Sequence, residues 1–327
     1  MKANRSSIIF MLVLALLSIG PDVAALTIKV GYPQLSGGSM PLWVITESKL
    51  DQRYGVDVKP IYIAGGATLT HSLIAGDVDI ALTGGAVVGA VLSGADLVYA
   101  GIGLSTYAFI VYARPDITEV KDLRGKVFGV MTRGASSDHA AIAFFTRYGM
   151  RAGQDVKFLY FARPGDLLAS LDKGIVVAGV FPSPTTVMAK RLGYKELVNI
   201  ASFKLPYPHN AIATRKTLIR QNPELIKGFL KAYLASIKTI HEEPEVAKKA
   251  LAHFLGSKDP EMIEDSYRSS APLFLKVPYM PEEAIRTVLS LSDNPKAAQA
   301  DPKAFFDNRL LKELEDTGFV KELYSRR

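Results

Sequence analysis

The chain of 327 residues contains no cysteine, which limits the ways in which it can be stabilised. A chain without cysteine forms no disulfide, so its fold must rest on an apolar core, and this length is sufficient to bury one. A lipid anchor on an N-terminal cysteine is excluded for the same reason.

Metal-binding and catalytic motifs are also missing from the sequence. There is no P-loop and no zinc-protease spacing, and Gly134–Asp138 begins like a nucleophile elbow but lacks its closing glycine. The histidines are dispersed along the chain: His71, His139, His209, His241 and His253. We therefore predict no catalytic residues, no metal site and no cofactor, and we interpret the protein as a non-enzyme.

The formal net charge is +7, but the lysines and arginines are scattered rather than clustered. Nucleic-acid binding requires a basic stripe interleaved with aromatic residues, and no such stripe is present. We exclude nucleic acid as a partner and interpret the positive charge as a solvated surface.

The N-terminus has the pattern of an export signal. Lys2 and Arg5 precede an apolar run over Ile8–Ile19, which is short for a membrane span, and Val23–Ala25 fits the small-residue cleavage pattern. We expect a signal peptide over residues 1–25 and a mature protein in the periplasm, with an uncleaved anchor as the alternative.

The segment Gly65–Ala86 contains two junctions at which a predicted strand turns directly into a helix. Gly66 lies in the first, shortly before Thr68, and Thr83-Gly84-Gly85 forms the second. A helix start exposes unpaired backbone N–H groups at the positive end of the helix dipole, which favours an anion. In an open parallel sheet such junctions lie where ligands bind. The alternative is that these glycines serve backbone geometry alone.

Similar junctions recur along the chain. Ser36–Ser39 precedes a helix that opens at Pro41 and runs to about Leu50, and Gly134–Asp138 follows a predicted strand. Strands and helices alternate as far as about Ala213, which indicates an α/β fold with parallel sheets. Beyond that point, apolar residues at helical spacing predict a long amphipathic helix, and Pro244, Pro260 and Pro281 then begin further helices.

Three motifs in this order carry a family resemblance: Ala75-Gly76-Asp77-Val78-Asp79, Asp122-Leu123-Arg124-Gly125-Lys126 and Asn222-Pro223-Glu224. With them, the chain resembles the substrate-binding proteins of ABC importers for nitrate, taurine and aliphatic sulfonates. The same family includes proteins that bind pyrimidine precursors of thiamine. The resemblance covers nearly all of Leu26–Val320.

The resemblance implies an α/β fold of the type II periplasmic-binding-protein class. Each of its two lobes would be a mostly parallel sheet flanked by helices, with two crossing strands between them. Lobe 1 would comprise residues 26–109 and 211–327, including the C-terminal helices, and lobe 2 residues 110–210. The crossings map to about Tyr107–Ala113 and Leu205–Ala213.

The resemblance also implies a ligand in the cleft, held by the junctions of both lobes. The expected ligand contacts are Ser36, Gly38, Ser39, Trp43, Gly66, Thr68, Thr83, Gly84, Gly85, Gly134, Ser136, Ser137, Phe181, Ser183 and His209. Trp43 would stack on an aromatic solute, with core packing as the alternative. His209 is a candidate for a ligand or a hinge contact. Whether Arg133 or Arg163 supplies a positive charge stays open.

We therefore expect a monomeric periplasmic receptor that closes on a small anionic organic solute, similar to a sulfonate, taurine or nitrate. It would present that solute to a permease in the inner membrane. Three alternatives stay open. The same fold would serve for a pyrimidine thiamine precursor or an aromatic carboxylate, for an enzyme similar to thiamine-pyrimidine synthases, or for a sensor of another membrane partner.

Overall fold

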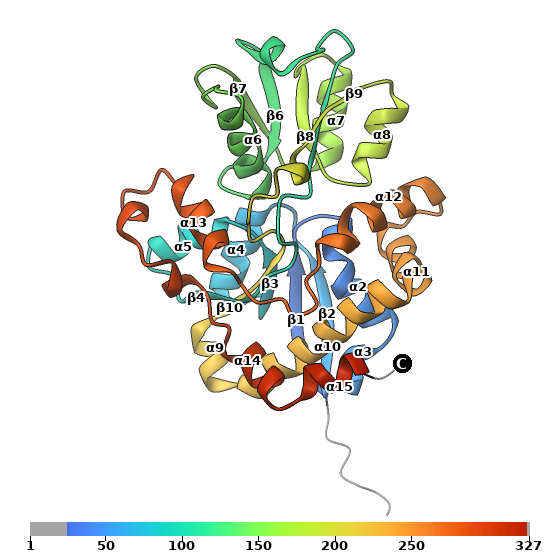
Figure 1. Ribbon diagram of the computed structural model, residues 1–327, viewed down its shortest axis with the longest axis vertical. Helices are drawn as coiled ribbons and strands as arrows, with labels where there is room; N and C mark the ends of the chain where they lie inside the picture. Colours follow the sequence, from blue (N-terminus) through green and yellow to red (C-terminus); the bar gives the residue numbers. More distant parts are fainter. Residues whose placement is uncertain (1–24, 326–327) are drawn as a thin grey trace, which may run out of the picture.

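The computed structural model describes residues 25–325 (Figure 1). The predicted signal peptide therefore lies outside the described residues, apart from Ala25. Within the described range, no helix combines the length and the apolar character that a membrane crossing requires.

The first of two sheets has the strand order β2-β1-β3-β10-β4. Its strands are β1 (Leu26–Tyr32), β2 (Val56–Tyr62), β3 (Ile80–Thr83), β4 (Leu97–Gly101) and β10 (Ala211–Arg215). β10 runs antiparallel to both of its neighbours, and the other four strands share one direction. We call this sheet and the helices packed on it lobe 1.

The second sheet has the order β7-β6-β8-β5-β9 and lies above the first in Figure 1. Its strands are β5 (Ile110–Ala113), β6 (Val127–Met131), β7 (Lys157–Phe161), β8 (Ala178–Phe181) and β9 (Lys195–Asn199). Here β5 alone is antiparallel to its neighbours. We call this sheet with its helices lobe 2. The prediction of two mostly parallel sheets flanked by helices is thus confirmed.

The reversed strand in each sheet follows from the path of the chain. The four strands of common direction point their carboxyl ends toward the opposite lobe (Figure 1). A chain that arrives from that lobe must first run away from it, so β5 and β10 are antiparallel. Because these strands begin at Ile110 and Ala211, the crossing segments are residues 102–109 and 204–210, and both end earlier than predicted. Backbone hydrogen bonds between Leu104 and His209 pair the two crossings.

Helices cover both faces of each sheet (Figure 1). Those of lobe 1 are α2 (Met40–Glu47), α3 (Leu50–Arg53), α4 (Gly66–Ala75), α5 (Ala86–Leu92), α9 (Lys216–Gln221), α10 (Pro223–Glu242), α11 (Pro244–Leu255), α12 (Pro260–Ser270), α13 (Glu282–Ser290), α14 (Arg309–Asp316) and α15 (Phe319–Ser325). Lobe 2 has α6 (Ser136–Arg147), α7 (Pro164–Asp172) and α8 (Thr185–Arg191). Short 3-10 turns are η1 (Gly37–Ser39), η2 (Val120–Leu123), η3 (Ile200–Phe203), η4 (Ala271–Leu273), η5 (Ala297–Gln299) and η6 (Pro302–Phe305).

The helix starts predicted after β10 agree with the structure, and two helices of the first half differ from the prediction. The amphipathic helix is α10, and the three predicted prolines stand at the beginnings of α11, α12 and α13. The helix predicted from Pro41 to Leu50 is divided into α2 and α3, because Lys49 takes a left-handed conformation. The helix expected over Leu69–Ala75 is α4, which already begins at Gly66, and Thr70 donates its hydroxyl proton back to the Gly66 carbonyl over 2.8 Å.

Candidate functional site

A small cavity lies between the lobes, where the carboxyl ends of β1, β3, β6 and β7 approach one another. About 40 Å³ of it is open to the centre of a water molecule. The cavity is lined by Pro33, Gln34, Gly65, Gly66, Thr83, Gly84, Phe109, Met131, Thr132, Ala135, Ser136, Ser137, Ala162, Pro164, His209 and Asn210. Both lobes and the two crossings therefore contribute to one enclosure.

The lining mixes polar and apolar groups and lacks full charges. Among the described residues that line it there is no Asp, Glu, Lys or Arg. Its polar groups are hydroxyls of serine and threonine, the amides of Gln34 and Asn210, the imidazole of His209 and backbone N–H groups. A solute in this cavity would be held by neutral hydrogen-bond donors and acceptors.

Two helix N-termini, one from each lobe, reach this cavity. α4 begins after Gly65 and α6 begins after Ala135, and neither N-cap makes a side-chain capping hydrogen bond within the described residues. The first-turn N–H groups of a helix have no acceptor within the helix, so these two sets of donors remain available. Together with the helix dipoles they create an environment that favours negative charge.

Asn210 adds a donor that has no partner. Its side chain is 2% exposed, and its Nδ2 atom makes no hydrogen bond to any residue of the described chain. A buried donor left in this state costs about 1–3 kcal/mol. The Nδ2 atom lies beside Gly38. Asn210 also has a positive φ of 49°, a conformation that asparagine tolerates better than most residues.

His209 fixes the geometry of the crossings. Its Nδ1 accepts a hydrogen bond from the Ala108 N–H over 3.0 Å, and its ring stacks on Phe109 with centroids 4.8 Å apart. Burial lowers the pKa of His209 to about 4, so the ring is neutral near pH 7 and Nδ1 can accept. The position of His209 therefore fits a hinge contact, and the residue also lines the cavity.

Tyr207 ties the two lobes together beside the cavity. Its hydroxyl oxygen accepts a hydrogen bond from the Gly85 N–H of lobe 1 over 2.9 Å. The same hydroxyl lies 3.0 Å from Nδ1 of His139 in lobe 2. Burial lowers the pKa of His139 to about 4, so this hydrogen bond joins two neutral groups near pH 7. Gly85 and His139 also line an outer groove, together with Arg133 and Gly134.

The structure brings only part of the predicted ligand contacts to the cavity. Gly66, Thr83, Gly84, Ser136, Ser137 and His209 line it. Gly85 and Gly134 line the outer groove instead. Ser36 and Ser39 contact Gln34 instead: the Gln34 side chain donates to the Ser36 hydroxyl, and the Ser39 hydroxyl donates to the Gln34 carbonyl. Gly38 packs against the side chain of Asn210. Thr68 is exposed on α4.

Three predicted contacts have other surroundings. Trp43 is fully buried and stacks on Phe254 of α11, since its position on α2 points away from the cleft. Phe181 is buried in the core of lobe 2 next to Tyr112. The Ser183 hydroxyl donates to Asp265 of α12 over 2.5 Å. We therefore assign packing to Trp43 and Phe181, and an interlobe contact to Ser183.

Neither arginine that was left open lines the cavity. Arg133 lies in the outer groove, where its guanidinium contacts Tyr160. Arg163 is exposed at the N-cap of α7. Of residues 25–325, no group of three or more His, Cys, Asp or Glu is placed to hold a metal ion.

Four hydrogen-bonding residues of the site were not predicted. Gln34, Thr132 and Asn210 line the cavity, and Tyr207 bonds to Gly85 beside it. Thr132 opens the junction that was recognised at Gly134, and Asn210 directly follows His209. Both could have been found by extending those two segments by one or two residues. The role of Tyr207 depends on a contact with His139, 68 residues away, which no local pattern reveals.

Comparison with known proteins gives matches across both lobes. The sequence profile described as NMT1/THI5-like matches residues 52–247. A Brachyspira hyodysenteriae protein, named for a periplasmic binding role in an ABC transporter, is 24% identical over 247 residues, which are 70% of this chain and 70% of that protein. The riboflavin-binding protein RibY of Chloroflexus aurantiacus is 28% identical over 141 residues, 43% of this chain and 39% of that protein.

Among solved structures, the periplasmic aliphatic sulphonate binding protein SsuA of Escherichia coli is similar in fold. Its TM-score is 0.69 at 21% sequence identity, and the match covers 87% of this chain and 96% of that one. At this identity the similarity shows a shared fold alone.

The two buried histidines predict a stability that falls in acid. Unfolding returns each imidazole from a pKa of about 4 to one near 6.5. Between these values the unfolded chain binds more protons, so the free energy of unfolding decreases as the pH falls from 6.5 to 4, by up to about 3 kcal/mol per histidine. Urea unfolding of His139→Gln should show a weaker pH dependence in this window than the unaltered protein. The exposed His71→Gln should behave as the unaltered protein does, and equal slopes for all three would contradict the assignment.

Proposed function

The chain belongs to the NMT1/THI5-like family, and from that premise we propose that it is the solute-binding component of an ABC importer. It captures a small anionic solute between its lobes. The observation that carries the proposal is the meeting of two uncapped helix N-termini, one from each lobe, at a single enclosed cavity. The names of the relatives support a binding role of this kind.

The donors around the cavity favour an anion over a cation. Helix N-termini contribute about 0.3–1 kcal/mol each to an anion, and up to ~2 kcal/mol when partly buried. A hydrogen bond from a neutral donor to a charged acceptor adds about 1.5–3 kcal/mol. Several such contacts reach the roughly −8 kcal/mol of micromolar binding without a lysine or arginine.

The size of the cavity favours a small group. One water molecule needs about 10–15 Å³ on the same measure, so the 40 Å³ available here suit a head group of a few atoms. A sulfonate, a nitrate or a short carboxylate fits this description. A flavin, the ligand in the name of the Chloroflexus relative, would require the lobes to move apart.

Capture would work by closure. A solute that binds the closed form better than the open form shifts the population toward closure, and no bond in the solute changes. The closed protein, a monomer in the periplasm, would then present the solute to a permease of the inner membrane. Recovery of the solute unchanged after binding distinguishes this function from that of an enzyme similar to thiamine-pyrimidine synthases.

A thermal-shift screen tests the proposal. The panel includes taurine, alkanesulfonates, nitrate, short carboxylates, a pyrimidine thiamine precursor and riboflavin. A solute at 100 times its dissociation constant adds about 2.7 kcal/mol, which raises Tm by roughly 5 °C for a protein of this size. We expect the sulfonates or another small anion to give the largest shift.

Variants then locate the bound solute. Asn210→Asp replaces the unpartnered donor with a carboxylate, and like-charge repulsion should weaken anion binding at least about a hundredfold in titration calorimetry. Asn199→Asp adds the same charge at a turn where the side chain only accepts from the Ala201 N–H, and should leave affinity unchanged. Equal affinity of the two variants, or preference for riboflavin over every small anion, would refute the proposal.

A second variant tests closure itself. A Cβ on Gly85 would lie 2.4 Å from His139 Nδ1 and 2.7 Å from the Tyr207 hydroxyl, so Gly85→Ala should keep the lobes apart. The backbone of Gly85 has a φ of −55°, which alanine adopts without strain. We expect solute affinity to fall at least about tenfold. Gly89→Ala, in the helix α5 that follows Gly85, is the control, because no atom lies within 4 Å of the new Cβ. Unchanged affinity in Gly85→Ala would contradict closure at the contact of Gly85 with Tyr207 and His139.

A further inference from the structure

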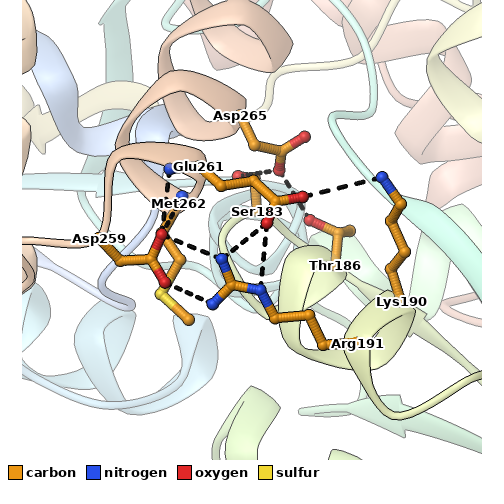
Figure 2. Close-up of polar contacts among 8 residues, drawn as sticks. All are labelled: Ser183, Thr186, Lys190, Arg191, Asp259, Glu261, Met262 and Asp265. Atoms are coloured by element: carbon orange, nitrogen blue, oxygen red, sulfur yellow. Dashed lines mark hydrogen bonds and ion pairs between the residues drawn. The ribbon is translucent and has the colours of Figure 1, made fainter.

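A second interlobe contact joins α8 of lobe 2 to α12 of lobe 1 (Figure 2). Its residues are Ser183, Thr186, Lys190 and Arg191 on one side and Asp259, Glu261 and Asp265 on the other. We call this set the clasp. Within the described chain, none of these residues lines the candidate cavity.

Arg191 forms the outer part of the clasp. Its two terminal nitrogens face the two carboxylate oxygens of Asp259 as a fork, with Nη2 3.0 Å from Oδ1 and Nη1 bonded to Oδ2. Nε and Nη2 also donate to Oε2 of Glu261, over 3.1 and 2.6 Å. Lys190 Nζ lies 3.7 Å from Oε1 of Glu261. Four charged groups thus form one network, and bidentate geometry of this kind makes the strongest ion pairs.

Asp265 forms the inner part. Its Oδ2 accepts hydrogen bonds from the hydroxyls of Ser183, over 2.5 Å, and Thr186, over 2.9 Å. Ser183 Oγ also lies 3.1 Å from the hydroxyl of Ser266. Ser183, Thr186 and Ser266 are all buried, so this layer is sheltered from water while Arg191 is about half exposed.

The acidic side of the clasp is held in place by lobe 1. Asp259 caps α12, because its carboxylate accepts from the N–H groups of Glu261 and Met262. The Tyr267 hydroxyl of α12 donates to the Ile240 carbonyl of α10 over 2.8 Å. The contact with α8 therefore spans the two lobes.

We propose that the clasp sets the fraction of closed protein and thereby the affinity for every solute, with Arg191 as a positioning residue that never touches the solute. The part that concerns affinity rests on the proposed function; the part that concerns closure does not. Observed affinity scales with the closed fraction when closure is required for binding. Loss of an exposed ion-pair network should therefore weaken all solutes by the same factor, about three- to tenfold.

The experiment measures closure without a solute. Because the chain has no cysteine, Lys173→Cys in lobe 2 and Lys303→Cys in lobe 1 supply the only two sites for spin labels. Pulsed electron resonance then gives the interlobe distance distribution. The test variant is Arg191→Gln. The control is Arg309→Gln, which breaks a similar exposed pair with Asp307 inside lobe 1.

We expect the short interlobe distance to lose population in Arg191→Gln and to persist in Arg309→Gln. Titration with the best solute and with a weaker one should give the same fold-change in Kd for Arg191→Gln. A double-mutant cycle of Arg191→Gln and Glu261→Gln should show that their effects on Kd are coupled, since the two side chains contact each other. If the solutes fail to bind but the distances change as stated, closure by the clasp stands and the proposed function falls. Identical distance distributions in the three proteins, or fold-changes that differ between solutes, would overturn the clasp.

Discussion

The unpaired N–H groups at the starts of α4 and α6 impose a constraint that much of the structure serves. They face the same cavity only because the parallel strands of both sheets end there, which in turn requires β5 and β10 to run in reverse. The residues at these ends must also be small. A Cβ on Gly84 would lie 2.1 Å from the Ser136 hydroxyl, and one on Gly66 would lie 3.3 Å from the Ala135 Cβ.

The charged groups of the interlobe boundary lie outside the cavity. Neutral donors surround the cavity, whereas ion pairs occur at the clasp between α8 and α12. His209 in the hinge and His139 in lobe 2 are likewise neutral near pH 7, because burial lowers the pKa of both. This division allows solute contacts and closure to be altered separately, because no described residue of the clasp lines the cavity.

The family resemblance and the two-sheet fold were predictable because they depend on local patterns that recur in order along the chain. Junction residues such as Gly66, Thr83 and Ser136 line the cavity because they end or closely follow a strand, which places them at its carboxyl end, where the cavity lies. Trp43 and Ser183 were misplaced for a different reason: proximity to a junction does not decide which way a side chain points. The contacts of Tyr207 with His139 and of Arg191 with Asp259 join residues far apart in the sequence, which no spacing indicates.

The central claim is that backbone amides of two facing helix starts hold the solute. Amide proton chemical shifts report on it directly, because an N–H that donates to an anion shifts downfield. On titration with the solute that binds most tightly, the largest downfield shifts should occur at Gly66 and Ala67 of α4 and at Ser136 and Ser137 of α6. Unchanged shifts at these four amides, with large changes elsewhere in the chain, would contradict the account.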